Sequence, residues 1–192
     1  MSVAALLIFI RALGLTLPLT IVAGWSAAEA AILFLVADIP ISWIAVRSGA
    51  RTGMLAAVVA AIASVLGTLA VLVWAGQDPA GATRIMAALP GIDAALVAEA
   101  ADRFNHGPCA ILAGAFSGIP FKLFALEAAK QDALGFLLLA PLLRLPRFLA
   151  VALFAGTVSR LLEGRMAVRQ RLLLLAGLWV LFYAFYFSVM PH

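Results

Sequence analysis

The chain has 192 residues, of which 66% are hydrophobic and 11% are charged, and its mean hydropathy is +1.14. Soluble globular domains are about 45–50% apolar and about 25% charged, so this composition excludes an ordinary soluble domain and predicts an integral membrane protein. The net charge of +4 sits mostly beside or within apolar segments, so we interpret the cations as membrane-topology signals and expect no nucleic-acid partner. The alternating ten-residue pattern of transmembrane β-barrels is absent. We therefore predict one all-α membrane domain over residues 1–192.

The first third of the chain predicts an N-terminal helix followed by a broken hairpin. Residues 3–24 are apolar apart from Arg11, which follows the apolar run instead of preceding it, so we expect retained structure and not a signal peptide. The sequence leaves open whether residues 1–24 span the membrane. The next apolar segment, 27–46, is interrupted by an acid and a proline, which favours a re-entrant hairpin over a straight span. Its predicted tip contains Asp38, Pro40 and Ser42.

The middle of the chain predicts one membrane span and one interfacial connection. Residues 52–76 form the clearest span, and its small residues are spaced for close helix packing: Ala63, Ser64, Gly67 and Ala70. Residues 81–104 combine helical apolar periodicity with charged positions and are divided by "LPGID". We expect two short amphipathic helices at the membrane surface there.

The last third predicts a second broken hairpin and two spans. Residues 108–130 are apolar but are interrupted by Gly118, Pro120 and Lys122. Residues 133–160 and 172–190 are long enough to cross a hydrocarbon core, which takes about 20 helical residues.

Charge asymmetry predicts the orientation of these segments. The loop 160–171 has four arginines against one glutamate, whereas the connection 77–105 has more acids than bases. The positive-inside rule then places loop 160–171 in the cytoplasm and segment 77–105, with the C-terminus, on the outer side. The two hairpins would enter from opposite sides, each followed by a span, as in the inverted repeats of transporters.

Three cations interrupt apolar segments: Lys122, Arg144 and Arg147. A cation at the bilayer centre costs about 2.5–3.5 kcal/mol on insertion scales, so such residues usually face a cavity or a partner. A helix that restarts after Pro120 would add free N–H groups, and with Ser117 the set would suit an anionic head group. The alternative is purely structural pairing of the cations with Asp38, Glu127 or Asp132.

Acidic residues and possible enzyme signals give further hypotheses. Asp38 and Glu127 are candidates for proton uptake during transport. Ser117 in "GAFSG" invites comparison with rhomboid proteases, but their motif is Gly-x-Ser-Gly with a histidine on a later span, whereas here His106 precedes the serine and the only later histidine is His192. We expect no enzyme activity, no cofactor and no metal site, because the single cysteine, Cys109, has no clustered partner.

Three segments of the chain, "FSGIPFKLF", "RLPRF" and "IPISW", resemble motifs of the DedA family, also called the VTT or SNARE-associated domain, and within it the YqaA-like branch. "FSGIPFKLF" is similar to the branch's Phe-Ser-Pro-Ile-Pro-Tyr-Lys-Val-Phe segment, and "RLPRF" is similar to its Gly-Arg-x-x-Arg-Phe segment. In the first half, "IPISW" resembles the family's Pro-x-x-Glu re-entrant tip. The resemblance covers about residues 36–160, followed by a C-terminal span at about 172–190.

The chain departs from the family pattern at four positions. Trp43 stands where the tip glutamate is expected, and Gly118, Phe121 and Leu143 replace a proline, a tyrosine and a glycine. The missing glutamate puts proton coupling in doubt unless Asp38 or Glu127 takes that role.

The resemblance implies a bacterial inner-membrane protein with two opposed re-entrant hairpins that moves a polyprenyl phosphate, such as undecaprenyl phosphate, or a phospholipid between leaflets. A non-transporting assembly protein that binds a membrane partner with the same hairpins is the alternative. The sequence leaves open the lipid, the coupling ion and a homo-oligomeric state.

Overall fold

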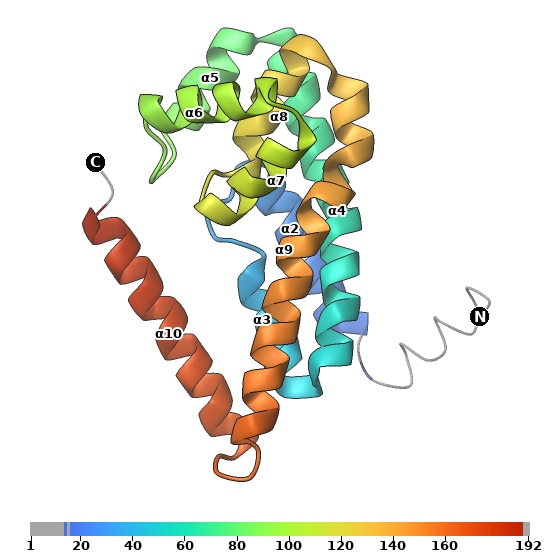
Figure 1. Ribbon diagram of the computed structural model, residues 1–192, viewed down its shortest axis with the longest axis vertical. Coiled ribbons are helices and arrows are strands. Elements are labelled where there is room, and N and C mark those ends of the chain that lie inside the picture. Colours follow the sequence, from blue (N-terminus) through green and yellow to red (C-terminus); the bar gives the residue numbers. More distant parts are fainter. Residues whose placement is uncertain (1–13, 15, 190–192) are drawn as a thin grey trace, which may run out of the picture.

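A computed structural model describes Gly14 and residues 16–189, and every regular element in this part of the chain is a helix. The prediction of an all-α protein is confirmed. Figure 1 shows the helices, whose bounds are α2 Thr16–Ala31, α3 Asp38–Ser48, α4 Ala50–Gln77, α5 Pro79–Ala87, α6 Ala94–Asn105, α7 Pro108–Ser117, α8 Phe121–Gln131, α9 Ala133–Leu162 and α10 Val168–Val189.

Three of these helices, α4, α9 and α10, are long and apolar enough to cross a membrane. They have 28, 30 and 22 residues, and they correspond to the predicted spans 52–76, 133–160 and 172–190. This arrangement is compatible with a multi-pass membrane protein. Most of the predicted N-terminal segment, residues 1–13 and 15, lies outside the described residues, and residues 16–24 form the first part of α2.

Helix α4 is the centre of the bundle, where it packs against α2, α3, α8 and α9. Small residues make the closest crossings. A Cβ atom built at Gly67 would clash with the backbone oxygen of Ala27 and lie 2.8 Å from Ala30 Cβ, so a side chain there would push α2 away. Of the four predicted packing residues, Ser64 and Gly67 are buried, whereas Ala63 is half-buried and Ala70 is exposed.

The first broken segment is divided earlier than the sequence predicted. Residues 32–37 connect α2 to α3, so Asp38 and Pro40 lie in the first turn of α3 and Ser42 lies inside it. Proline is tolerated in a first turn because its missing N–H would have no intrahelical acceptor. The connection itself contains neither glycine nor proline, and tertiary partners satisfy its backbone: Trp25 Nε1 donates to the oxygen of Leu35 at 3.0 Å, and the Val36 N–H donates to the Tyr183 hydroxyl at 2.9 Å.

The second broken segment is divided where predicted. Helix α7 ends at Ser117, and Gly118 has a left-handed conformation with φ of +94° that favours glycine. Pro120 is the N-cap residue of α8. The chain therefore turns over residues 118–120 before α8 begins.

The predicted interfacial connection forms two separate helices, α5 and α6, at one end of the molecule, and the α3–α4 and α9–α10 connections lie at the other end (Figure 1). Aspartates cap three helices at the first end. Asp78 accepts from the Gly81 N–H, Asp93 from the Leu96 N–H and Asp132 from the Gly135 N–H, at 2.7–2.9 Å. These caps fix where α5, α6 and α9 begin.

Helix α10 diverges from α9 above their connecting loop (Figure 1) and has no fully buried residue. Its second half is attached by polar contacts of aromatic residues. Trp179 Nε1 donates to Ser42 Oγ at 3.1 Å, and the Tyr186 hydroxyl donates to the oxygen of Gly91 at 3.3 Å. The helix begins at Val168, four residues before the predicted start, so Arg169 and Arg171 belong to its first turn.

Candidate functional site

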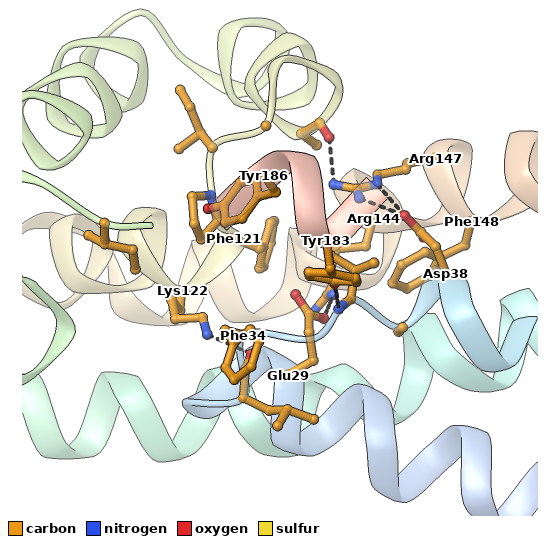
Figure 2. A pocket seen from close by; sticks show the side chains of 18 of the residues that line it. Glu29, Phe34, Asp38, Phe121, Lys122, Arg144, Arg147, Phe148, Tyr183 and Tyr186 are labelled. Atoms are coloured by element: carbon orange, nitrogen blue, oxygen red, sulfur yellow. Dashed lines mark hydrogen bonds and ion pairs between the residues drawn. The ribbon is translucent and has the colours of Figure 1, made fainter. Parts of the chain in front are cut away.

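A cavity of about 130 Å³ lies where the two broken segments meet the middle of α9. Its wall includes the connection 32–37, the turn 118–120 and the side chains of Phe182, Tyr183 and Tyr186 from α10. Figure 2 shows five ionisable side chains around it: Glu29, Asp38, Lys122, Arg144 and Arg147. Four elements separated in the sequence, α2, α3, α8 and α9, supply these five groups.

Arg144 is buried and forms an ion pair with Glu29 of α2. Its guanidinium carbon lies 5.1 Å from the ring centre of Phe121 and 4.9 Å from that of Phe148. Cation–π contact of this kind stabilises a desolvated guanidinium. The Arg144 side chain is therefore fixed in place by one carboxylate and two rings.

Arg147 joins α9 to both broken segments. Its Nη2 and Nε donate to Asp38 Oδ2 at 2.6 and 3.0 Å, and its Nη1 donates to the oxygen of Ala115 in α7 at 2.9 Å. Asp38 is buried, whereas Arg147 is partly exposed to the cavity and the groove beside it. Arg147 thus holds α3 and α7 at the same level of α9.

Lys122 is the third cation, and it is only 2% exposed. Its Nζ donates to the oxygen of Leu33 at 2.8 Å (Figure 2). No carboxylate lies within ion-pair distance of Lys122 among the described residues. Lys122 therefore contributes a charge that neither carboxylate of the cluster neutralises directly.

The ends of four helices, α2, α3, α7 and α8, meet at the level of the cluster, and their backbone groups take part in its electrostatics. The connection after α2 and the last turn of α7 offer carbonyl oxygens, and these accept from Lys122 and Arg147. The first turns of α3 and α8 instead present N–H groups, and Ala37, Asp38, Pro120 and Phe121 line the cavity. Helix N-termini carry partial positive charge, so both the backbone and the side chains favour an anion here.

The charge of the cluster is not balanced. With all five groups ionised, three cations face two carboxylates, which leaves one positive charge. Two buried polar atoms of the cluster, Arg144 Nη1 and Asp38 Oδ1, have no hydrogen-bond partner among the described residues. Buried polar groups are rarely left unpaired, so the free Nη1 donor suits a ligand oxygen.

The structure brings together only part of the predicted site. Lys122, Arg144, Arg147, Asp38, Gly118 and Pro120 line the cavity, whereas Ser117, Pro40, Ser42 and Glu127 do not. Ser117 Oγ donates to the oxygen of Gly114 at 3.1 Å, Ser42 contacts Trp179, and Glu127 pairs with Lys130 at 2.8 Å. Glu127 is therefore not the partner of Lys122, and the second carboxylate of the cluster, beside Asp38, comes from another residue.

That carboxylate is Glu29, which the sequence analysis missed. The signal was present, since Glu29 is an ionisable residue in an apolar segment, and such residues are functional candidates by default. Its partner Arg144 is 115 positions away, so the pairing could not be read from local spacing. The aromatic side chains of α10 were missed for the same reason.

Comparisons of the chain with protein-family models, with curated proteins and with solved structures give no match. The resemblance to the DedA family therefore stays a prediction from three short motifs.

Proposed function

We propose that this protein is a DedA-type membrane transporter that moves an anionic lipid, either a polyprenyl phosphate or a phospholipid, between the leaflets of a bacterial inner membrane. In this proposal the hairpins α2–α3 and α7–α8 are re-entrant and enter from opposite faces. The observation that carries it is the largely buried cluster of three cations and two carboxylates where the hairpins meet, which has one excess positive charge when all five groups are ionised.

The head group binds between Arg144 and Arg147 and replaces contacts that the carboxylates now make. A phosphate oxygen takes the free Arg144 Nη1, and another takes the donors of Arg147 that Asp38 now occupies. Bidentate contact with phosphate is the usual preference of arginine. Asp38 is left without its cation when a phosphate displaces it from Arg147, so Asp38 is the candidate for proton coupling in this proposal.

Binding requires the wall of the cavity to move. Ligand pockets are usually about 300–1,000 Å³, and this cavity has about 130 Å³. The α10 side chains Phe182, Tyr183 and Tyr186 cover it on one side. Displacement of α10 would open the cluster sideways to the bilayer, so that the lipid tail stays in the hydrocarbon.

The test is lipid flipping in proteoliposomes that contain a fluorescent anionic lipid. We expect Lys122→Ala and Arg147→Ala to lower the flipping rate at least tenfold at equal reconstitution. Arg84→Ala removes an exposed cation from α5 and is the matched control, with an expected rate within twofold of the unmodified protein. An unchanged flipping rate in both cluster variants would contradict the assignment of Lys122 and Arg147 to the head-group site.

A non-transporting assembly protein is the second candidate, because each cation of the cluster already has a partner within the protein. Arg144 pairs with Glu29, Arg147 pairs with Asp38, and Lys122 binds a backbone oxygen, so the five groups could serve only to hold the hairpins together. Purified protein that flips no anionic lipid and co-purifies with one partner in fixed ratio would favour this candidate.

A further inference from the structure

A second cavity lies between α9 and α10, on the side of the molecule where the loop 163–167 joins them, and it shares Val36, Asp38, Arg147 and Phe182 with the first cavity. It is a groove of about 630 Å³. Most of its wall is apolar: Ala150, Phe154 and Val158 line it from α9, and Leu174, Leu178 and Phe182 line it from α10. Figure 1 shows α10 diverging from α9 above their connecting loop. Two membrane-length helices thus leave an apolar slot between them.

The end of the groove nearest the loop 163–167 carries a cation, Arg171, whose side chain is held in place by hydrogen bonds. Arg171 Nη1 donates to both the backbone oxygen and the hydroxyl of Ser159 at 2.8 Å, while the buried Nε has no hydrogen-bond partner among the described residues. The surrounding end of the molecule adds Arg160, Arg165 and Arg169 against Glu163. None of these four arginines forms an ion pair with another described residue.

The length of the groove matches one leaflet. Arg171 and Phe182 are about 16 Å apart along α10 at about 1.5 Å per residue, and half of a hydrocarbon core is about 15 Å. The inner end reaches Asp38 and Arg147, near the middle of α9. A hydrocarbon chain of a lipid that starts at Arg171 would therefore end at the level of the charge cluster. This is the orientation of an ordinary lipid in the leaflet on the side of the loop 163–167.

We propose that the groove between α9 and α10 binds one hydrocarbon chain of an anionic phospholipid whose phosphate lies against Arg171. Basic pockets between transmembrane helices are typical sites for anionic head groups. The phosphate site at Arg171 is distinct from the Arg144–Arg147 cluster, which only the inner end of the groove reaches. The proposal does not depend on transport, because it requires only that a lipid be retained.

The experiment is a titration of the purified full chain in detergent with phosphatidylglycerol and with phosphatidylcholine, followed by native mass spectrometry. We expect phosphatidylglycerol to bind at least tenfold more tightly. Arg171→Gln should abolish that preference. Arg165→Gln removes an exposed cation from the neighbouring loop 163–167 and should change the preference less than twofold. Equal binding of the two lipids, or an unchanged preference in Arg171→Gln, would overturn the proposal.

Two further variants test the binding of the hydrocarbon chain separately from that of the head group. Ala150→Trp fills the groove from an exposed position and should weaken binding at least tenfold, whereas Leu153→Trp, on an exposed position of α9 outside the groove, should not. Full binding in Ala150→Trp, or complete competition by inorganic phosphate, would exclude a chain in the groove.

Discussion

At the scale of single residues, Arg144 belongs to the proposed head-group site and also forms a buried ion pair that stabilises the fold. The guanidinium is buried between two phenyl rings and one carboxylate. Removal of one member of a buried ion pair leaves the other charge uncompensated, which costs about 3–5 kcal/mol. Removal of both members avoids that cost. A loss of function in a single variant at this position could therefore reflect unfolding.

We expect Arg144→Gln to lower the free energy of unfolding by about 3–5 kcal/mol, because Glu29 is left charged and buried. The double variant Glu29→Gln/Arg144→Gln should recover most of that loss. Unfolding of the detergent-solubilised protein, followed by tryptophan fluorescence, measures both values. A double variant that is less stable than the single variant would show that the pair is not the unit that the geometry indicates.

At the scale of elements, the position of the cluster depends on how closely α2 crosses α4. Gly67 permits that crossing, since a Cβ atom there would overlap the backbone of Ala27. Glu29 lies between the α2 residues Ala27 and Ala30 that contact Gly67. The ion pair of Glu29 with Arg144 therefore depends on the same helix crossing. The small residue in α4 thus positions a carboxylate on another helix.

Gly67→Leu should destabilise the protein by about 1–3 kcal/mol, the usual cost of overpacking a close contact. Gly76→Leu is the control on the same helix, because nothing lies within 4 Å of a Cβ atom at that position, and we expect a change within about 0.5 kcal/mol. Thermal unfolding in detergent distinguishes the two. Equal stability of both variants would contradict the close α2–α4 crossing.

At the scale of the whole molecule, the connections fall into two groups at opposite ends. The α3–α4 and α9–α10 connections share one end, and α5 and α6 occupy the other (Figure 1). Four arginines, Arg160, Arg165, Arg169 and Arg171, lie in or beside the loop 163–167 at the first end, so the positive-inside rule predicts that this end faces the cytoplasm. The orientation predicted from charge is consistent with this grouping.

Cysteine labelling tests that orientation in a Cys109→Ser background. We expect Ala88→Cys, between α5 and α6, to react with an impermeant maleimide added outside intact cells. Arg165→Cys should react only after the membrane is permeabilised, and both should react equally in detergent. The reverse pattern would invert the topology.

The parts of this organisation that could be predicted from sequence are those with local causes. Gly118 and Pro120 mark the second break because a left-handed turn and an N-cap are local features, and apolar length marks α4, α9 and α10. The first break could not be placed, because residues 32–37 are held open by Trp25, Tyr183 and Lys122 from other parts of the chain. Glu29 was missed for the same reason, since only the tertiary structure brings it to Arg144.

The most direct test of the proposed anion site is the flipping rate of an anionic lipid in the double variant Glu29→Gln/Arg144→Gln. This variant removes one positive and one negative charge, so the cluster keeps its net charge and the fold is expected to survive, but the free donor of Arg144 is lost. If the head group binds there, flipping falls at least tenfold although the protein reconstitutes and unfolds normally. A rate equal to that of the unmodified protein would contradict the account and leave the cluster a structural role.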